Sequence, residues 1–310
     1  MARRSRSLLV LALLLGVGAA GLAVTALGLG SMTSSADAVA DLAPADRTGP
    51  SGPLRDGRPA AIAHPPPDGE PTLDEDFDDL DPDLWGRCFW WQPVGCTIAS
   101  NDEQQRYLPE NVGVKDGVLR LEAREDPGTG GEGVELPYSS GMVTTGAPEY
   151  EEPARWDFTY GYIEARLRLP AGQGLWPAFW LLPSTQESRP EIDVLEVLGH
   201  LPEQAEFHYH YDDEDGERAS LGDDVTIPAI ADGDWHTYAV DWSPGRITWI
   251  VDGIARYEVT GADVSDEPMY LVLNLAVGGE WPGDPDETTP FPAVVEADHI
   301  RVWTADEGPP

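Results

Sequence analysis

Three carboxylates lie close together in one short hydrophobic segment, Glu191-Ile192-Asp193-Val194-Leu195-Glu196. The apolar residues between them indicate a buried strand, where an unpaired charge is unfavourable by several kcal/mol, so a chain rarely keeps such acids without a use. In a regular strand Glu191 and Asp193 share one face, whereas Glu196 points to the other. A β-bulge around Val194-Leu195 would insert one residue, return Glu196 to the first face and direct all three acids into one cleft.

Two glutamates on one face of this strand could cleave a glycosidic bond. Their Cα atoms would lie roughly 13 Å apart, and side chains that lean together could reach the separation of about 5 to 5.5 Å used by retaining glycosidases. One glutamate would attack the anomeric carbon and the other would protonate the leaving oxygen, while Asp193 shares a proton with them and holds their pKa values apart. The alternative is an acidic surface strand, but exposed acids do not require flanking Ile, Val and Leu.

Aromatic residues near these acids could bind a sugar ring by stacking. Trp176 and Trp281 each stand beside a proline in a turn, which favours a place in the cleft, whereas Trp180 lies in an apolar run and is expected in the core. His210 belongs to an alternating segment, 207–211, and could hydrogen-bond a sugar or the acids, although a structural role is equally open. The sequence contains no G-x-S-x-G elbow, H-E-x-x-H motif or P-loop that would indicate other chemistry.

The elements that must position these residues are strands. Polar and apolar residues alternate with a period of two in several short segments, which predicts one buried and one solvated face for each. Asp252-Gly253 predicts a two-residue hairpin turn. No run of ten or more residues outside the N-terminal segment has helical periodicity, so the sequence predicts an all-β sandwich or jelly roll. The expected strands are 162–169, 236–242, 247–251, 256–259, 269–275 and 299–303.

The chain is expected to have three parts. Residues 1–40 begin with Arg3, Arg4 and Arg6 and continue with an apolar run, the pattern of a secretory signal peptide, although the run is long enough for a retained signal anchor. Residues 41–70 are rich in Pro, Gly and Asp and predict a disordered linker. Residues 71–306 then form one domain. The expected location is extracellular, or membrane-anchored if the N-terminal segment is retained.

Cys88 and Cys96 are the two cysteines of the chain. In an exported protein so close a pair favours a disulfide over half of a metal site. This disulfide would fix the loop Phe89-Trp90-Trp91.

The charge balance restricts the partners. The chain has 19 Lys and Arg against 56 Asp and Glu, a formal charge of −37. This balance argues against nucleic acids and anionic membranes as partners, because both require clustered basic residues. We expect a soluble monomer without an obligate protein partner. Sulfated or uronic polymers would be repelled unless a local basic patch exists, whereas a neutral polymer would not.

The sequence resembles glycoside hydrolase family 16 over nearly the whole domain. The bulged signature Glu-x-Asp-x-x-Glu stands at Glu191, Asp193 and Glu196, and the resemblance implies that these are nucleophile, assisting acid and acid/base. The family fold is a β-jelly roll of two packed antiparallel sheets, like concanavalin A, with the substrate cleft across the concave sheet. Further matching segments are 101–104 with Tyr107, 140–144, 160–166, 174–180, 273–282 and Asp298 with 301–302.

The six-residue signature is similar to the laminarinase and agarase side of the family. This implies endo-acting hydrolysis of β-1,3- or β-1,4-linked glucans or galactans, and we expect a secreted endo-β-1,3-glucanase that needs no cofactor for its chemistry. Asn101 and Trp91 join Trp176, Trp281 and His210 as expected substrate contacts. Ser188-Arg189-Pro190, where laminarinases usually have Trp-Pro and Gly, suggests different walls near Glu191. A related neutral glycan, exopolysaccharide processing, transglycosylation and a non-catalytic lectin-like role are the alternatives.

Many family members bind a structural calcium on the convex face. The resemblance implies such a site here, with Asp298 and the carbonyl of Gly117 as ligands.

Overall fold

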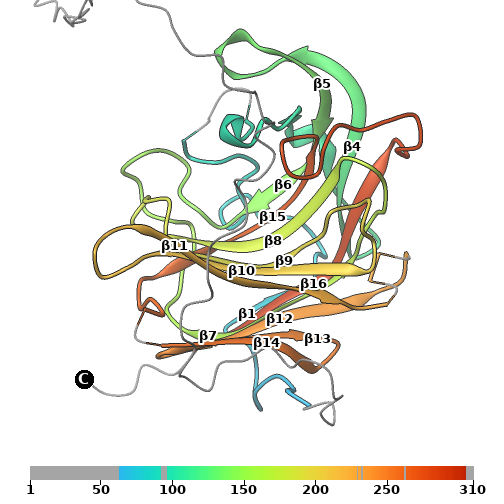
Figure 1. Cartoon of the computed structure of the whole chain (residues 1–310). Helices are drawn as coiled ribbons and strands as arrows, with labels where there is room; N and C mark the ends of the chain where they lie inside the picture. The colour runs from blue at the N-terminus through green and yellow to red at the C-terminus, as the bar shows by residue number, and fades with distance from the viewer. Residues whose placement is uncertain (1–62, 92–95, 229, 232, 262, 305–310) are drawn as a thin grey trace, which may run out of the picture. The chain divides into compact units, whose positions relative to one another are not determined.

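Two β-sheets packed face to face make up the folded part of the chain (Figure 1). The structure, a computed structural model, describes residues 63–91, 96–228, 230–231, 233–261 and 263–304. Among these residues one sheet has six strands, in the order β11-β10-β9-β8-β15-β6. Their bounds are β11 Arg218–Thr226, β10 Gln204–Asp212, β9 Glu191–Glu196, β8 Leu175–Pro183, β15 Met269–Val277 and β6 Met142–Thr144.

The second sheet has ten described strands, eight of them in the order β14-β13-β12-β7-β16-β4-β5-β2. Strand β1 adds to β16, strand β3 adds to β4, and the strand pairs are antiparallel except β2 with β5. Three single-turn 3-10 helices, η1 Ala99–Asn101, η2 Pro109–Asn111 and η3 Gly131–Gly133, connect strands. The bounds in this sheet are β14 Ile254–Thr260, β13 Arg246–Val251, β12 His236–Ser243, β7 Gly161–Arg168, β16 Ala293–Thr304, β4 Val118–Thr129, β5 Glu135–Ser140, β2 Gln105–Tyr107, β1 Leu73–Glu75 and β3 Val112–Lys115.

The all-β sandwich expected from the sequence is confirmed. In β12 the alternation places Tyr238, Val240 and Trp242 in the core between the sheets. The predicted hairpin joins β13 to β14, with Asp252 and Gly253 both at positive φ, 52° and 70°. In the described part of the chain, none of the helices has the length and apolar character that crossing a membrane requires.

The outer face of β7 differs from the expectation of a solvated surface. Tyr162 and Glu164 point away from the core, yet they are 4 % and 8 % exposed. Tyr162 packs with Trp303 of β16, and the His64 ring stacks on it with a centroid distance of 6.3 Å. Residues distant in the sequence therefore cover this face, which period-two alternation cannot predict.

Contacts of the sandwich begin before residue 71. His64 Nε2 lies 2.8 Å from Asp241 Oδ2, and Trp303 Nε1 donates to the Gly69 carbonyl at 3.0 Å. The last residues of the expected linker thus bind the ten-stranded sheet. The expected signal segment, residues 1–40, and residues 41–62 lie outside the described residues.

The predicted disulfide between Cys88 and Cys96 is present, with Cα atoms 5.7 Å apart. Phe89, inside the closed loop, stacks on Trp91 at 4.3 Å and also contacts Trp180 of β8. The disulfide therefore holds an aromatic loop against the six-stranded sheet.

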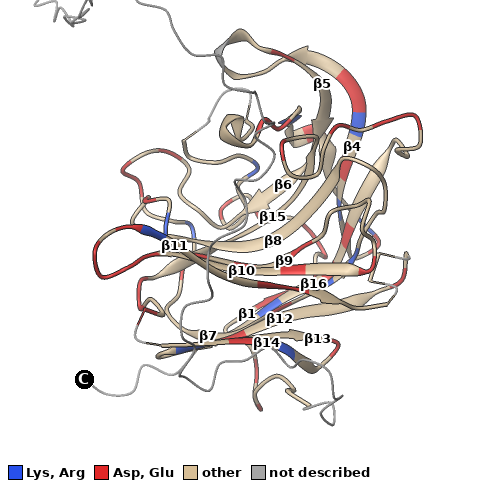
Figure 2. Ribbon diagram, in the orientation of Figure 1, with Lys and Arg blue, Asp and Glu red and all other residues tan. Residues whose placement is uncertain are grey.

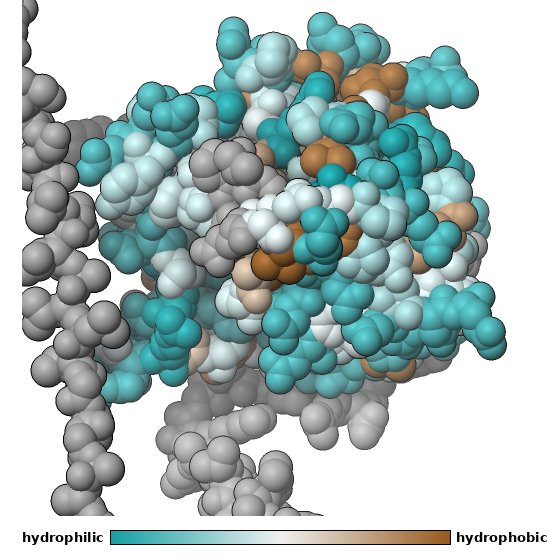
Figure 3. All heavy atoms as spheres, turned by 90° about the horizontal axis from the view of Figure 1, so that it is seen from above, coloured by the Kyte–Doolittle hydropathy of each residue, from teal (hydrophilic) through white to brown (hydrophobic). Residues whose placement is uncertain are grey.

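Charged residues follow the expected pattern of a solvated acidic surface. Acidic positions occur on strands and connecting loops of both sheets and clearly outnumber basic ones (Figure 2). The face seen in Figure 3 is mainly hydrophilic, with small separate hydrophobic areas.

Candidate active site

A bulge in β9 brings the three signature acids onto one face. Strand β10 pairs His208 with Asp193 and then Glu206 with Glu196, so Val194 and Leu195 together oppose one residue. Both of these side chains lie in the core between the sheets. Because two successive residues point inward, Glu196 returns to the face of Glu191 and Asp193, and all three line one cleft of about 360 Å³.

Glu196 is held at both carboxylate oxygens. Trp176 Nε1 donates to Oε1 at 3.0 Å, and His208 Nδ1 lies 2.9 Å from Oε2. The side chain is 7 % exposed. These contacts come from the two strands that flank β9, so the sheet itself fixes the orientation of this carboxylate.

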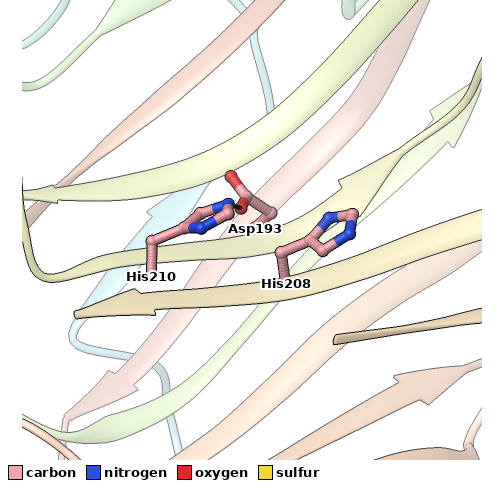
Figure 4. Close-up of side chains that lie close together, drawn as sticks. All are labelled: Asp193, His208 and His210. Carbon is pink, nitrogen blue, oxygen red and sulfur yellow. Dashed lines mark ion pairs between the residues drawn. The ribbon is translucent and has the colours of Figure 1, made fainter. Parts of the chain in front are cut away.

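Asp193 lies beside two histidines of β10. Figure 4 shows Asp193, His208 and His210 on the same side of the two neighbouring strands. His210 Nε2 lies 3.4 Å from Asp193 Oδ2, which has no hydrogen-bond partner among the described residues. From the core, Trp249 Nε1 donates to the Asp193 carbonyl at 2.7 Å and anchors the bulge.

Burial and mutual repulsion shift the acids toward their protonated forms. Burial raises the pKa of Glu191 well above its ordinary value, and the charge of Asp193 adds to this shift. The pKa of Asp193 is raised by burial and by the charge of Glu196. Burial alone lowers the pKa of His208, but the hydrogen bond and charge of Glu196 outweigh it, so this pKa lies above 6.5. The cleft therefore favours a proton shared among the carboxyl groups.

Aromatic side chains form the walls of the cleft. Trp176 and Trp281 line it and meet edge to face, with a centroid distance of 5.3 Å. Trp281 is 41 % exposed and can stack on a ligand. Trp180 packs in a small core cluster, and it also lines the cleft, where its Nε1 donates to Asn274 Oδ1 at 2.7 Å.

The other expected contacts lie around Glu191. Asn101, from η1, and His210 line the same cleft as the acids. Trp91 lines an adjoining hollow of about 400 Å³ that shares Asn101 and Glu191 with it. The structure thus brings the sequence-predicted residues to one face of the six-stranded sheet.

Two residues of the site were not predicted from the sequence. Glu103 lines the cleft as a buried carboxyl that accepts hydrogen bonds from Gln105 Nε2 at 2.6 Å and Asn101 Nδ2 at 3.1 Å. His208 binds Glu196, although the sequence indicated only that it shares a face with His210. Glu103 has no apolar neighbours in the sequence that would have indicated its burial. The position of His208 could have been predicted from the pairing register of β9 with β10.

One group could hold a metal ion. Asp193, His208 and His210 each offer one ligand atom, and these atoms lie within 4.8 Å of one another. Among the described residues, this is the group of three acidic, His or Cys side chains that lie close enough to share an ion. Two imidazoles and a carboxylate are ligands typical of zinc.

The expected calcium site does not fit the residues present. Asp298 Oδ2 lies 3.1 Å from Arg166 Nη1 and 3.0 Å from His299 Nδ1. A guanidinium at this distance already compensates the carboxylate and would repel a divalent cation. In this structure the Asp298 carboxylate is thus engaged by Arg166 and His299, and a calcium ion would have to displace these contacts.

Comparisons with known proteins agree with this geometry. The sequence model of glycosyl hydrolases family 16 matches residues 101–298. A beta-glucanase of Rhodothermus marinus is 34% identical over 242 residues, which cover 69% of this chain and 78% of that protein. An endo-1,3-1,4-beta-glycanase of Rhizobium meliloti is 37% identical over 238 residues, 72% of this chain and 48% of the relative. The match thus spans about half the length of this relative.

Solved structures show the same fold. The laminarinase catalytic domain of Thermotoga maritima superimposes with a TM-score of 0.65 and 30% identity, covering 76% of this chain and 98% of that one. The laminarinase of Rhodothermus marinus gives a TM-score of 0.62 with 31% identity, covering 76% of this chain and 97% of the other. The two-sheet sandwich is thus the fold of these laminarinases.

Proposed function

The chain belongs to glycosyl hydrolases family 16, and from this premise we propose that it is a secreted retaining endo-β-glycanase that hydrolyses β-1,3-glucan or a related β-glycan. The observation that carries the proposal is the bulge of β9, which places Glu191, Asp193 and Glu196 in one cleft. The names of the relatives support β-glucan as the substrate class.

The three acids divide the reaction between them in this proposal. Glu191 attacks the anomeric carbon and forms a glycosyl ester, while Glu196 gives its proton to the leaving oxygen. Glu196 then takes a proton from the water that releases the sugar. Asp193 shares a proton with its neighbours and stabilises the charge that moves between them. Carboxyl groups carry every step, so the chemistry needs no cofactor.

The aromatic walls support an extended polymer rather than a single sugar. Trp176 and Trp281 stand beside Glu196, and Trp91 lies in the hollow that adjoins Glu191. A chain that crosses β9 would therefore meet aromatic faces on both sides of the cleaved bond. Asn101 and His210 could donate hydrogen bonds to its hydroxyl groups.

The first test uses Glu191→Gln and Glu196→Gln on laminarin. Glu196→Gln should lose about 10² to 10⁴-fold in kcat, the range expected for an acid or base placed at the reacting bond. Glu191→Gln lacks the nucleophile and should lose at least as much. The readout is the release of reducing ends, and Glu110→Gln, an exposed glutamate of η2, is the matched control.

A dinitrophenyl glycoside separates the two roles. Its leaving group departs without a proton, so bond cleavage by Glu196→Gln should recover, whereas Glu191→Gln should stay inactive. Two variants as fast as the parent on laminarin would contradict the mechanism. Products longer than the supplied oligosaccharide, seen by mass spectrometry, would indicate glycosyl transfer instead of hydrolysis.

We also propose that the protein is exported and acts as a monomer. The basic start and apolar run of residues 1–40 support export, and the polysaccharide substrate is extracellular. Ala36-Asp37-Ala38 and Ala38-Val39-Ala40 are two small-residue cleavage patterns. Sequencing the N-terminus of protein recovered from the medium and from membranes would distinguish cleavage at one of them from anchoring. Sedimentation of the purified protein would measure the oligomeric state.

A further inference from the structure

A third hollow, of about 600 Å³, opens beside Glu191 at the edge of the catalytic cleft. Arg189 and Arg218 line it together with the hydroxyl-bearing side chains Ser100, Ser188 and Ser220. The hollow shares Glu191 and His210 with the catalytic cleft. A sugar bound at the Glu191 end therefore lies next to this polar space.

Basic residues are concentrated here in an otherwise acidic protein. The linings of the catalytic cleft and of the aromatic hollow contain no Lys or Arg among the described residues. On the ten-stranded sheet, Arg166, Arg168 and Arg301 pair with acids of the same sheet or of the chain before it. The two arginines of the third hollow are thus the basic groups that a bound polymer would meet.

Arg189 is held in place before any ligand arrives. Its Nε donates to Asp212 Oδ1 at 2.7 Å, and its Nη1 donates to Ser188 Oγ at 3.2 Å. The side chain is 18 % exposed, so the guanidinium has little freedom. A fixed guanidinium binds a planar anion with little loss of conformational entropy.

Arg218 has no ion-pair partner in the part of the chain that the structure describes. It is the first residue of β11, where basic colour adjoins a red loop in Figure 2. Asp212 stands opposite Arg218 in the β10–β11 register but binds Arg189. The carboxylates next to the two guanidiniums are those of Asp212, which Arg189 binds, and Glu191, which lines the same hollow. Arg218 thus keeps a guanidinium that no carboxylate binds among the described residues, although acids of the loop 213–217 precede it in the chain.

We propose that this hollow is a subsite for a carboxylate-bearing substituent, so that the preferred substrate is an acidic β-glycan. The inference rests on the proposed glycanase function and specifies its substrate class. Guanidinium groups form charge-assisted, often bidentate hydrogen bonds with carboxylates. The serine hydroxyls add donors around the same space.

The overall charge of −37 does not oppose this binding. At 0.15 M ionic strength the Debye length is about 8 Å, so exposed acids further away are largely screened. A contact with Arg218 inside the hollow is shorter than this length. An anionic group can therefore be accepted here by a protein that repels polyanions at long range.

The test compares a neutral β-1,3-gluco-oligosaccharide with the same oligosaccharide carrying a carboxymethyl group, at 0.15 M NaCl. The parent should show the higher kcat/KM on the carboxymethyl form. In Arg218→Gln the ratio of the two kcat/KM values should fall about ten-fold, as expected for one charge-assisted hydrogen bond. Arg246→Gln, an exposed arginine at the start of β13 on the other sheet, should keep the parental ratio.

A binding measurement separates this inference from the proposed function. Calorimetric titration of the Glu196→Gln variant, with and without Arg218→Gln, measures the preference for the carboxymethyl form in the absence of turnover. A parent that cleaves neither oligosaccharide but binds the carboxymethyl form more tightly refutes the glycanase and keeps the subsite. Equal affinity of the Glu196→Gln protein for both forms, or a preference unchanged by Arg218→Gln, overturns the subsite.

Discussion

Two histidines balance the charge of the acids in the cleft. Burial raises the pKa of Glu191 and of Asp193, and electrostatic interaction with His210 opposes this shift for Glu191, as that with His208 does for Asp193. Glu191 must be ionised to attack, so the interaction with His210 favours its reactive form. Asp193 can hold the remaining proton between the two glutamates.

Glu103 gives a pH dependence of stability that can be measured. Burial raises its pKa from 4.5 to about 7, although hydrogen bonds from Gln105, Asn101 and Ile98 oppose this shift. Because the folded pKa is raised, its contribution to stability is complete below pH 4.5 and is lost as the pH rises through about 7. Relative to the parent, the melting temperature of Glu103→Gln should therefore rise by several degrees over this window.

The change in melting temperature across the pH range is the relevant quantity. The glutamine could destabilise the fold by an amount that does not depend on pH, for example through a poorly placed amide hydrogen. Such an effect is the same at every pH and cancels when the melting-temperature differences are compared across the range. Glu125→Gln, an exposed glutamate of β4, should show no such trend. A flat difference between Glu103→Gln and the parent from pH 4.5 to 8 would refute the raised pKa.

Sequence reasoning found the acids but not all of their partners. The spacing of Glu191, Asp193 and Glu196 within one hydrophobic segment is local information, so it could be interpreted directly. The contact of His208 with Glu196 depends on how β10 aligns with β9. Glu103 binds the nearby Gln105 and Asn101, but its place in the cleft depends on how this segment packs beside β9. Such tertiary alignment is not encoded in a residue pattern.

At the scale of the element, the bulge of β9 is the feature that makes the site. Strand β8 pairs Trp180 with Asp193 and Phe179 with Leu195, which leaves Val194 without a partner. Without Val194 the pairing with both neighbours would be regular. In that strand Glu191, Asp193 and Glu196 would alternate with core residues and still share the cleft face.

Deletion of Val194 should therefore preserve the cleft. The variant loses one buried side chain and should be destabilised by about 1 to 3 kcal/mol, yet it should keep measurable hydrolysis of laminarin. Circular dichroism gives the stability, and reducing-sugar release gives the activity. Insertion of an alanine after Val194 is the counterpart. Alternation would again direct Glu196 to the cleft face, but six strand steps would place its Cα roughly 20 Å from that of Glu191. The two carboxyl groups could then not approach to about 5 to 5.5 Å, so the insertion should abolish activity.

A folded but inactive deletion variant would show that the bulge has a role beyond the direction of Glu196.

The bulge was predictable because three acids on one face require it. The covered outer face of β7 was not, because Trp303 and His64 reach Tyr162 from distant parts of the chain. Periodicity indicates which side of a strand is apolar, but it does not indicate what later packs on the other side.

For the whole molecule, the excess of acidic residues in the sequence becomes a negatively charged surface in the fold. The 56 acidic and 19 basic residues give a formal charge of −37, and both sheets carry acids on their surfaces (Figure 2). Repulsion among like charges destabilises the compact state, whereas surface ion pairs such as Arg301 with Asp74 contribute little. The net effect of surface charge on folding should therefore be unfavourable at low salt.

Added salt should consequently stabilise this protein. The Debye length falls from about 30 Å at 0.01 M to about 3 Å at 1 M, which screens the repulsion among exposed acids. The melting temperature should rise by several degrees between 0.01 M and 1 M NaCl. Sucrose strengthens burial without screening charge, so NaCl should exceed sucrose of equal osmolality in its effect. A melting temperature that falls steadily with NaCl would mean that ion pairs such as Arg301 with Asp74 outweigh the repulsion.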